Sequence, residues 1–261
     1  MGPGPSELWN SIAPQWMLEL PEGLHDFIYT LYKCFIYDDR YMMYIKGLGN
    51  TLTLTFFSLL VGIVLGVLVS IVRVSWDKHG QEMRNPVARF FFRIANAICK
   101  IYLTVIRGTP VVVQLMIIFF GIMATSNNKV LAGTIAFGIN SGAYVAELIR
   151  SGIMSIDGGQ MEAGRSLGLG YVQSMRYIIL PQAFKHILPA LANEFIVLIK
   201  ETAVAGYVGL ADLTYAGSIV AGNSYTYFVP MLGVAAIYLI IVMFFTWLVG
   251  KLERRLRASE R

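Results

Sequence analysis

The sequence predicts an all-α polytopic membrane protein with five transmembrane helices. Hydrophobic residues make up 56% of the chain and charged residues only 14%, which is far from the balance of a water-soluble domain. A hydrocarbon core of about 30 Å takes about 20 apolar residues of helix to cross, and several stretches are long enough. We expect spans at residues 48–74, 89–123, 130–148, 187–210 and 228–248.

The second span is expected to bend. The segment Arg107-Gly108-Thr109-Pro110 interrupts it before the apolar stretch from Val111 to Met123. Proline inside a helix removes a backbone hydrogen bond and kinks or breaks the helix. We interpret residues 89–123 as one bent span, so that five spans place the two ends of the chain on opposite sides of the membrane.

Lysine and arginine collect on one side of this topology. They are frequent after the first, third and fifth spans, whereas only Lys129 lies between the second and third, and residues 202–248 contain none. Cytoplasmic loops retain basic residues, which predicts an external N-terminus and a cytoplasmic C-terminus. The net charge of +5 reflects this sorting, and no basic patch interleaved with aromatic residues indicates nucleic-acid binding.

The predicted domain organisation has three parts. Residues 1–46 form an external segment, 47–253 form the transmembrane domain with a cytoplasmic loop at about 151–186, and 254–261 form a basic cytoplasmic tail. Apolar residues near helical spacing in the external segment indicate an amphipathic helix at the outer membrane interface; a poorly ordered leader is the alternative. These apolar residues are Leu24, Phe27, Ile28, Leu31, Phe35 and Ile36.

The sequence contains no pattern for a cofactor or metal. Cys34 is expected in the external segment and Cys99 in a span, so we expect no disulfide between them, and metal-ligand spacing is absent. The phosphate-binding pattern Gly-x-x-x-x-Gly-Lys-Ser/Thr is also absent. We therefore expect this chain to bind no cofactor or metal and to lack an ATPase site of its own.

The cytoplasmic segment from Glu162 to Pro181 is the most informative part of the chain. Asp157 is expected to cap a short helix over residues 160–167, which Gly168 and Gly170 would stop. A second helix is expected over residues 171–180, ending at Pro181. A short helix bounded by glycines on the basic side of a membrane protein is suited to being held by a cytoplasmic partner.

This segment also resembles a known family. Glu162-Ala163-Gly164, followed by Gly168, Ile178 and Leu180-Pro181, is similar to the signature loop of binding-protein-dependent ABC importer permeases, although the usual third residue is alanine. Further motifs resemble the polar amino-acid branch, and together they cover about residues 47–253. They are Gly47-Leu48 with Thr51-Leu52, Arg107-Gly108-Thr109-Pro110 with Gln114-Leu115, Ala143-Tyr144 with Glu147 and Arg150, Gly159-Gln160, Pro181-Gln182-Ala183 and Ile199-Lys200-Glu201-Thr202.

The resemblance implies a type I ABC importer permease fold with a coupling helix that sits in a groove of an ATPase subunit. It also implies that ATP and magnesium bind to that subunit, that a second permease subunit, identical or paralogous, completes the pore, and that an extracellular or periplasmic protein binds the amino acid. The residues assigned to ATPase coupling are Asp157, Glu162, Ala163, Gly164 and Gly168. Gly164 and Gly168 would let the partner's surface approach the backbone closely. A self-contained amphipathic loop on the membrane surface is the alternative.

Charged residues in the fourth span are candidates for the transport path, because ionisable groups inside a membrane are costly. Glu194 and Glu201 are seven residues apart and share a helix face, about 10 Å apart along the axis, and Lys200 lies about 100° away. A zwitterion would fit them, with its ammonium near a glutamate and its carboxylate near Lys200. The family's Lys-acid-Thr-Ser-Leu pattern lacks its serine here, at Ala203. A structural ion-pair lattice is the alternative.

Arg107, Asn140 and Tyr144 complete the predicted pathway set, with weaker support. Arg107 lies beside the helix break, where free carbonyls need donors, so a structural role competes with substrate contact. Glu147 and Arg150 are three residues apart and are expected to pair locally. The spacings Gly62/Gly66 and Gly138/Gly142 indicate close contacts between helices.

Taken together, these observations predict the permease subunit of an ABC transporter that imports polar or basic amino acids across a bacterial cytoplasmic membrane. The chain is not expected to be an enzyme. A structural or sensory protein that anchors an ATPase without transporting is one alternative. An intramembrane enzyme using Glu147, Glu194 or Glu201 as an acid or base is another, and it is disfavoured because no nucleophile-base set recurs.

Overall fold

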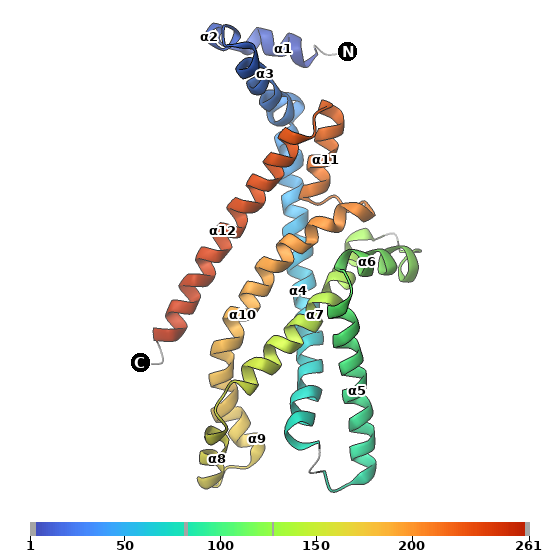
Figure 1. Cartoon of the computed structure of the whole chain (residues 1–261), viewed down its shortest axis with the longest axis vertical. Coiled ribbons are helices and arrows are strands. Elements are labelled where there is room, and N and C mark those ends of the chain that lie inside the picture. The colour runs from blue at the N-terminus through green and yellow to red at the C-terminus, as the bar shows by residue number, and fades with distance from the viewer. Residues whose placement is uncertain (1–3, 81–82, 127, 259–261) are drawn as a thin grey trace. The chain divides into compact units, whose positions relative to one another are not determined.

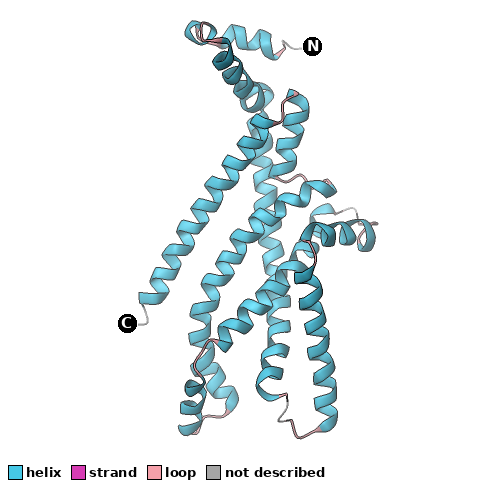
Figure 2. Cartoon of the chain, in the orientation of Figure 1, coloured by secondary structure: helices cyan, strands magenta, loops and turns pink. Residues whose placement is uncertain are grey.

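The computed structural model describes residues 4–80, 83–126 and 128–258, and every regular element within those ranges is a helix (Figure 2). The chain divides into two compact units, residues 1–52 with 203–241 and residues 53–202 with 242–261. Two long helices run through both units: α4, Arg40–His79, and α12, Phe228–Ala258 (Figure 1). The all-helical prediction is therefore confirmed.

The N-terminal part of the first unit consists of short helices around one buried tryptophan. Trp9 is 6% exposed, its ring packs against those of His25 and Tyr32, and its Nε1 donates a hydrogen bond to His25 Nε2 at 3.2 Å. A helix is present where the apolar spacing predicts one, whereas its place at the membrane interface stays a prediction. The elements are α1 Pro5–Ile12, α2 Gln15–Leu18, α3 Glu22–Leu31, the π-type turn η1 Tyr32–Ile36 and the 3₁₀ turn η2 Tyr37–Asp39.

The remainder of the first unit packs helix α11, Leu213–Ser224, against the first turns of α4. Asp212 caps α11 by accepting hydrogen bonds from the backbone N–H groups of Thr214 and Tyr215, as acidic N-caps do. The Thr51 hydroxyl accepts a hydrogen bond from the Leu213 N–H at 3.0 Å. A 3₁₀ segment, η5 Thr202–Val208, precedes this cap.

The second unit contains the other long helices. Asn85 caps α5 through hydrogen bonds to the N–H groups of Val87 and Ala88, and Pro86 occupies the first turn, where no N–H donor is needed. The elements are α5 Pro86–Gly108, α6 Val111–Met116, the π-type turn η3 Ile117–Ile122, α7 Lys129–Met154, α8 Gly158–Ser166, α9 Tyr171–Ser174, the π-type turn η4 Met175–Ile179 and α10 Leu180–Glu201.

Glycines let α4 and α7 approach closely within this unit. A Cβ at Gly66 would lie 2.5 Å from Val145 Cγ1, and one at Gly62 would lie 3.0 Å from Ser141 Cβ. From the other helix, a Cβ at Gly138 would lie 2.6 Å from Val61 Cγ1. The close helix contact predicted from the small-residue spacing is thus confirmed.

The break at Pro110 is sharper than a kink. α5 and the segment Val111–Ile122 meet at 109°, and α5 alone, at about 35 Å, is as long as a membrane span. By length and composition, two helical stretches of the described residues can cross a membrane, Glu22–His79 and Phe228–Leu256, and a third if the bent pair is one span. Polar residues lower the hydropathy of α7 and α10, so five spans stay a prediction.

The helix after the cytoplasmic turn does not end at Pro181 as expected. α9, the π-type turn η4 and α10 form one uninterrupted helical path from Tyr171 to Glu201. Pro181 lies in the first turn of α10, directly after the wider π-type turn, where its missing N–H is tolerated. Pro181 therefore marks a change of helix type and not a terminus.

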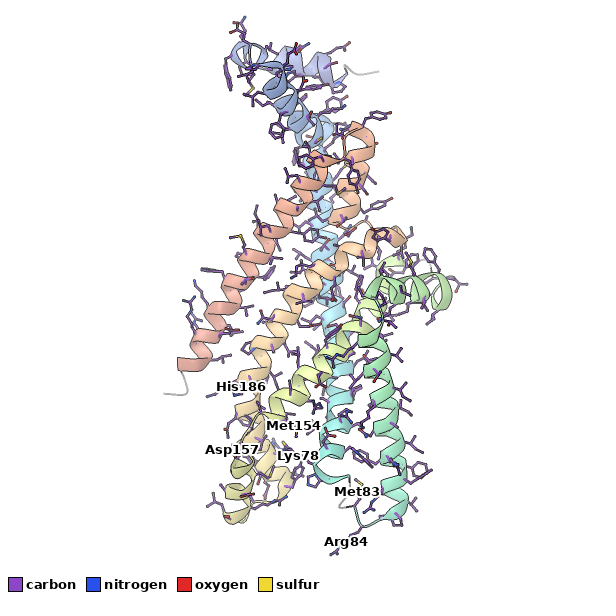
Figure 3. The ribbon with its side chains drawn as sticks, in the orientation of Figure 1. Lys78, Met83, Arg84, Met154, Asp157 and His186 are labelled. Atoms are coloured by element: carbon purple, nitrogen blue, oxygen red, sulfur yellow. The ribbon has the colours of Figure 1, made fainter. Side chains whose placement is uncertain are left out.

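The segments that follow the first and third predicted spans share one end of the second unit. Figure 3 shows Lys78 in the last turn of α4, and Arg84 after it, at the same end as Met154, the last residue of α7, and Asp157 after it. This arrangement agrees with the alternation read from the basic residues. α12 continues to Ala258, so the predicted basic tail is helical up to that residue, whereas residues 1–3 of the external segment and 259–261 of the tail lie outside the described residues.

Candidate functional site

Helix α8 begins at its predicted cap. Asp157 Oδ1 accepts a hydrogen bond from the Gly159 N–H at 2.9 Å, which satisfies one of the free donors at the helix N-terminus. The helix starts at Gly158, two residues before the predicted range, because the cap residue itself directly precedes it. Asp157 is thus explained by the local fold, whatever else it contacts.

Gly168 ends α8 by its backbone conformation. Its φ is +79°, a region that favours glycine. The N–H of Leu169 bonds to the carbonyl of Gly164 at 3.0 Å, and the N–H of Gly168 bonds to the carbonyl of Arg165 at 2.9 Å. These two bonds form a Schellman motif, in which a left-handed residue closes the helix end. The predicted stop at Gly168 is confirmed.

Gly164 faces the chain's own interior. It is buried, and a Cβ there would lie 2.6 Å from Ser174 Oγ and 3.0 Å from Ile178 Cδ1. The close backbone approach that this glycine permits is therefore made by α9 and η4. The Oγ of Ser174 is fully buried and has no hydrogen-bond partner among the described residues.

The exposed surface of α8 and of the residues that follow it is formed by other side chains. Glu162 and Ala163 are exposed, and so are two apolar side chains beyond them, Leu167 at 79% and Val172 at 74%. Tyr171 packs edge-on against His79 at a ring distance of 4.2 Å, and burial raises the pKa of its phenol. The segment is thus anchored on one side and presents an apolar and acidic surface on the other.

Glu194 is the buried ionisable residue among the described residues of the second unit. Its side chain is 8% exposed, and Oε1 accepts a hydrogen bond from Ser141 Oγ at 2.9 Å across α10 and α7. Lys200 is exposed and Glu201 is partly buried. Within the described residues no salt bridge involves Glu194, Lys200 or Glu201.

Asn140 and Gln114 form a second buried polar pair. Gln114 Nε2 donates to the carbonyls of Ile106 and Thr109 at 2.8 and 3.1 Å, which are the carbonyls freed at the helix break. Gln114 Oε1 accepts from Asn140 Nδ2 at 3.0 Å, and Asn140 is 2% exposed. Gln114, and not Arg107, supplies the donor expected at the break. Asn140 Oδ1 has no partner among the described residues.

Arg107, beside this break, lies against the ring of Tyr144. The guanidinium carbon of Arg107 is 5.7 Å from the centre of the Tyr144 ring, within cation–π distance. Arg107 is exposed and Tyr144 is partly buried. The six predicted pathway residues thus form three local groups, and neither of the two larger pockets described below is lined by any of them.

The predicted pair of Glu147 and Arg150 is confirmed and belongs to a larger network. Arg150 Nη2 lies 2.6 Å from Glu147 Oε1, and Arg150 Nη1 lies 3.5 Å from Asp77 on α4. Arg73 Nη2 lies 3.7 Å from the same aspartate, and its Nη1 donates to Asn96 on α5 at 2.6 Å. The network links α4, α5 and α7, and hydrogen bonding to Glu147 raises the pKa of Arg150.

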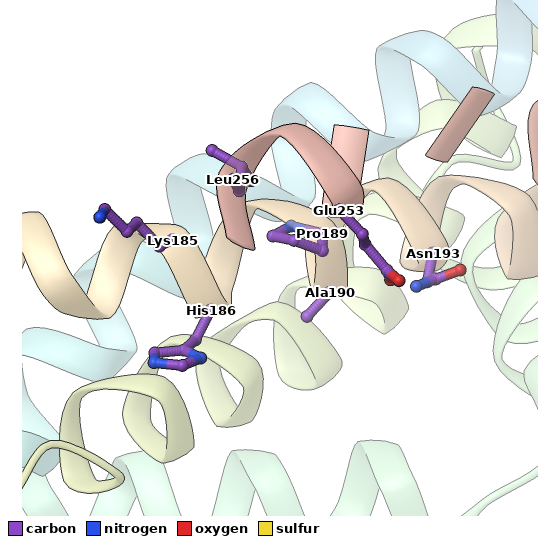
Figure 4. A pocket seen from close by; sticks show the side chains of 7 residues that line it. All are labelled: Lys185, His186, Pro189, Ala190, Asn193, Glu253 and Leu256. Atoms are coloured by element: carbon purple, nitrogen blue, oxygen red, sulfur yellow. The ribbon is translucent and has the colours of Figure 1, made fainter. Parts of the chain in front are cut away.

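Two pockets lie between α10 and the end of α12. One encloses about 540 Å³ and is polar, with Lys185, His186, Asn193 and Glu253 among its lining residues (Figure 4). The other encloses about 770 Å³ and is lined mainly by apolar side chains of α4, α10 and α12. No group of three or more His, Cys, Asp or Glu residues in the described part of the chain could hold a metal ion.

The roles of two site residues, Ser141 and Gln114, are not apparent from the sequence. Ser141 is a small polar residue beside Asn140 in an apolar helix, which is the only signal that the sequence gives. Gln114 follows Pro110 by four residues, one helical turn after the break, and that spacing could have marked it as the donor for the freed carbonyls. These features define a class of protein: an all-helical, multi-pass membrane component with polar groups inside an apolar bundle.

The family is shown by sequence. Residues 86–258 match the family described as "Binding-protein-dependent transport system inner membrane component", and the chain belongs to that family. It is therefore a permease subunit of an ABC transporter, and its relatives are permease subunits and not enzymes. The arginine transport system permease protein ArtQ of Bacillus subtilis (strain 168) is 35% identical over 219 residues, covering 83% of this chain and 93% of that protein.

Further relatives agree with this assignment. The glutamine transport system permease protein GlnP of Escherichia coli (strain K12) is 35% identical over 217 residues, covering 82% of this chain and 92% of that protein. A crystal structure of an amino acid ABC transporter with histidines is 41% identical, with a TM-score of 0.72 over 82% of this chain and 94% of that one. The inward-facing MetNI methionine ABC transporter is 22% identical, with a TM-score of 0.69 over 85% and 99%, and supports the fold alone.

Proposed function

We propose that this permease carries polar or basic amino acids inward across a bacterial cytoplasmic membrane, driven by ATP hydrolysis on partner subunits. Its relatives are named for arginine and glutamine, and a 41% identical structure is of an amino acid transporter. An α-amino acid carries one ammonium and one carboxylate, so its path needs charged or polar groups that an apolar bundle would otherwise exclude.

The hydrogen bond between Ser141 and Glu194 is the observation that carries this proposal. A carboxylate buried in an apolar bundle is costly, and Ser141 gives it one donor at 2.9 Å. Its remaining acceptor capacity is available to a substrate ammonium. Lys200 lies on the same helix, is exposed and has no salt bridge among the described residues, so it can receive a carboxylate. Glu201 is the second acid of this set, and Asn140, Tyr144 and Arg107 are proposed to border the path.

The proposed topology has five spans, an external N-terminus and a cytoplasmic C-terminus. The one-sided distribution of basic residues supports it, as does the shared end of the segments that follow α4 and α7. Residues 1–46 are then external, 47–253 form the transmembrane domain, and 254–261 are a cytoplasmic tail. The second span is then the bent pair of α5 and Val111–Ile122, which meet at 109°.

The proposed partners are two ATPase subunits that bind ATP and magnesium, a second permease subunit, and an extracellular or periplasmic amino-acid-binding protein. The short helix α8 is the proposed ATPase contact, because Glu162 and Ala163 are exposed on it and Leu167 is exposed directly after it. Asp157, Gly164 and Gly168 would act by shaping this helix: the first caps α8, the second lets α9 pack closely, and the third ends the helix.

Reconstitution tests the proposal. The chain and its partners are placed in liposomes, and uptake of labelled arginine and glutamine is measured with and without ATP. Glu194→Gln is expected to lower uptake by at least about tenfold while the complex elutes normally, since losing one charge-assisted contact costs about 1.5–3 kcal/mol. Lys200→Gln and Glu201→Gln test the other two charges, and Glu19→Gln, an exposed acid of the external segment, is the control.

The outcomes separate the competing functions. If the substituted complexes fail to assemble, the charges are structural. If the unsubstituted complex hydrolyses ATP but takes up no amino acid of a full panel, the chain anchors an ATPase without transporting. Turnover by the purified chain without an ATPase would indicate an enzyme.

A further inference from the structure

The apolar pocket of the second unit is a groove with two cations at one end. Phe56 and Ile63 of α4, Leu188 and Phe195 of α10, and Leu248 of α12 are among the apolar side chains that line about 770 Å³. Lys251 and Arg255, one helical turn apart on α12, are the charged residues of the lining, and no acidic residue belongs to it.

Both cations are available to a ligand. Lys251 and Arg255 are exposed, and no salt bridge within the described residues involves either. Lys251 Nζ lies 3.7 Å from the centre of the Trp247 ring, which also lines the groove, and the ammonium N–H groups that do not face the ring can bind an anion. Glu253, between them in sequence, lines the polar pocket instead (Figure 4).

We propose that this groove binds one anionic phospholipid of the cytoplasmic leaflet, with an acyl chain along the apolar walls and the phosphate on Lys251 and Arg255. The length agrees, because the path along α12 from Phe245 to Arg255 is roughly 15 Å, which is half of the roughly 30 Å hydrocarbon core and so the depth that the acyl chains of one leaflet occupy. The charge agrees, because basic residues at the cytoplasmic end of a span attract anionic headgroups. This inference depends on the proposed cytoplasmic orientation of the end of α12, and lipid binding is measured without transport.

The groove needs an occupant of this kind. In the apolar stretch of α12 only 17% of the residues are buried within the chain, and Trp247 and Phe56 are each more than half exposed. An acyl chain covers such a surface without requiring further hydrogen bonds. The cation pair, with no acid opposite, then selects the headgroup charge.

Native mass spectrometry of the purified full-length chain in detergent tests this proposal. Phosphatidylglycerol and phosphatidylcholine with identical acyl chains are titrated separately. We expect one phosphatidylglycerol molecule to bind tightly to the unsubstituted chain. Its affinity should be about 30-fold lower in the K251Q/R255Q variant, which corresponds to about 1 kcal/mol of binding free energy for each cation. Arg254→Gln is the matched control, because Arg254 lines neither pocket and its Nε donates to the Gly250 carbonyl.

A second variant separates the groove from general surface charge. Ala192→Trp places an indole in the apolar lining and leaves both cations in place. We expect it to displace the tight phosphatidylglycerol as well. Equal affinity for phosphatidylglycerol and phosphatidylcholine would overturn the proposal. So would a loss of phosphatidylglycerol binding in K251Q/R255Q together with unchanged binding in Ala192→Trp. If both variants instead leave lipid binding unchanged and convert permease dimers to monomers, the occupant is a second permease, and the proposal is wrong.

Discussion

Gly164 and Ser174 are packed so closely that an alanine at position 164 would bring its Cβ to 2.6 Å from the Ser174 Oγ. The family signature usually has alanine there. In this chain the residue is glycine, whose helix propensity is about 1 kcal/mol less favourable than that of alanine. The missing side chain leaves room for the buried Ser174 hydroxyl on the facing helix. The two positions therefore depend on one another, and α8 is held against α9 by this contact.

Gly164→Ala is expected to destabilise the fold despite its better helix propensity. Overpacking of this kind lowers the free energy of unfolding by about 1–3 kcal/mol, and the higher helix propensity of alanine raises it by about 1 kcal/mol. The cost should fall in a Ser174→Gly background, where the hydroxyl and its carbon are absent. Thermal unfolding of the purified chain, followed by circular dichroism, measures the four members of this double-mutant cycle. Gly158→Ala is the control in α8, because its Cβ would meet nothing within 4 Å. Additive effects would show that the two positions are independent.

Gly168→Ala is expected to loosen the end of α8. A side chain at φ +79° costs about 1 kcal/mol or more, although nothing lies within 4 Å of the new Cβ. Hydrogen exchange of the Leu169 amide, which bonds to Gly164, should accelerate by about fivefold. Gly170→Ala provides the comparison, because Gly170 has φ −69° and an alanine there meets only Gln173 at 3.6 Å. Similar exchange in both variants would argue against a conformational role for Gly168.

Ser141→Ala is expected to destabilise the second unit, because it leaves the Glu194 carboxylate buried without its donor. Loss of one partner of a buried charged group costs about 1–3 kcal/mol. The loss should be smaller in a Glu194→Gln background. Denaturation in mixed micelles provides the measurement. Ser151→Ala on the same helix is the control, since that exposed hydroxyl bonds to the Leu148 carbonyl of its own helix. Equal losses at Ser141 and Ser151 would contradict the assignment.

Gly66→Ala is expected to push α4 away from α7. Its Cβ would lie 2.5 Å from Val145 Cγ1 and 2.9 Å from the backbone nitrogen of Ala146, and backbone cannot rotate away. We expect a loss of about 1–3 kcal/mol. Gly49→Ala, near the start of the same helix, meets nothing within 4 Å and should gain slightly from helix propensity. Both are compared by the midpoint of thermal unfolding in detergent, and equal midpoints would refute the close packing.

The features that could be predicted from the sequence depend on local spacing. Asp157 as a cap, Gly168 as a stop and the pair of Glu147 with Arg150 each involve residues within a turn or two of one another. The contact between α4 and α7 followed from a glycine repeat on each helix. The helical class followed from composition alone.

The features that could not be predicted join distant parts of the chain. Ser141 and Glu194 are 53 residues apart and Gln114 and Asn140 are 26 apart, so no periodicity reports either bond. Pro181 was expected to end a helix, because the sequence does not reveal the π-type turn that precedes it. The inward orientation of Gly164 likewise depends on the small residue that faces it, Ser174.

The uninterrupted helical path through η4 has a mechanical consequence. The path begins at Tyr171, close to the short helix α8, and ends at Glu201. Thirty residues of helix separate these ends by roughly 45 Å. A rigid path of this length would act as a lever: a tilt of about five degrees at the first end would displace the second by about 4 Å, without a hinge at Pro181. Pro189 is the one interior position of α10 where proline removes a ladder bond, which makes it the point where such a lever would flex.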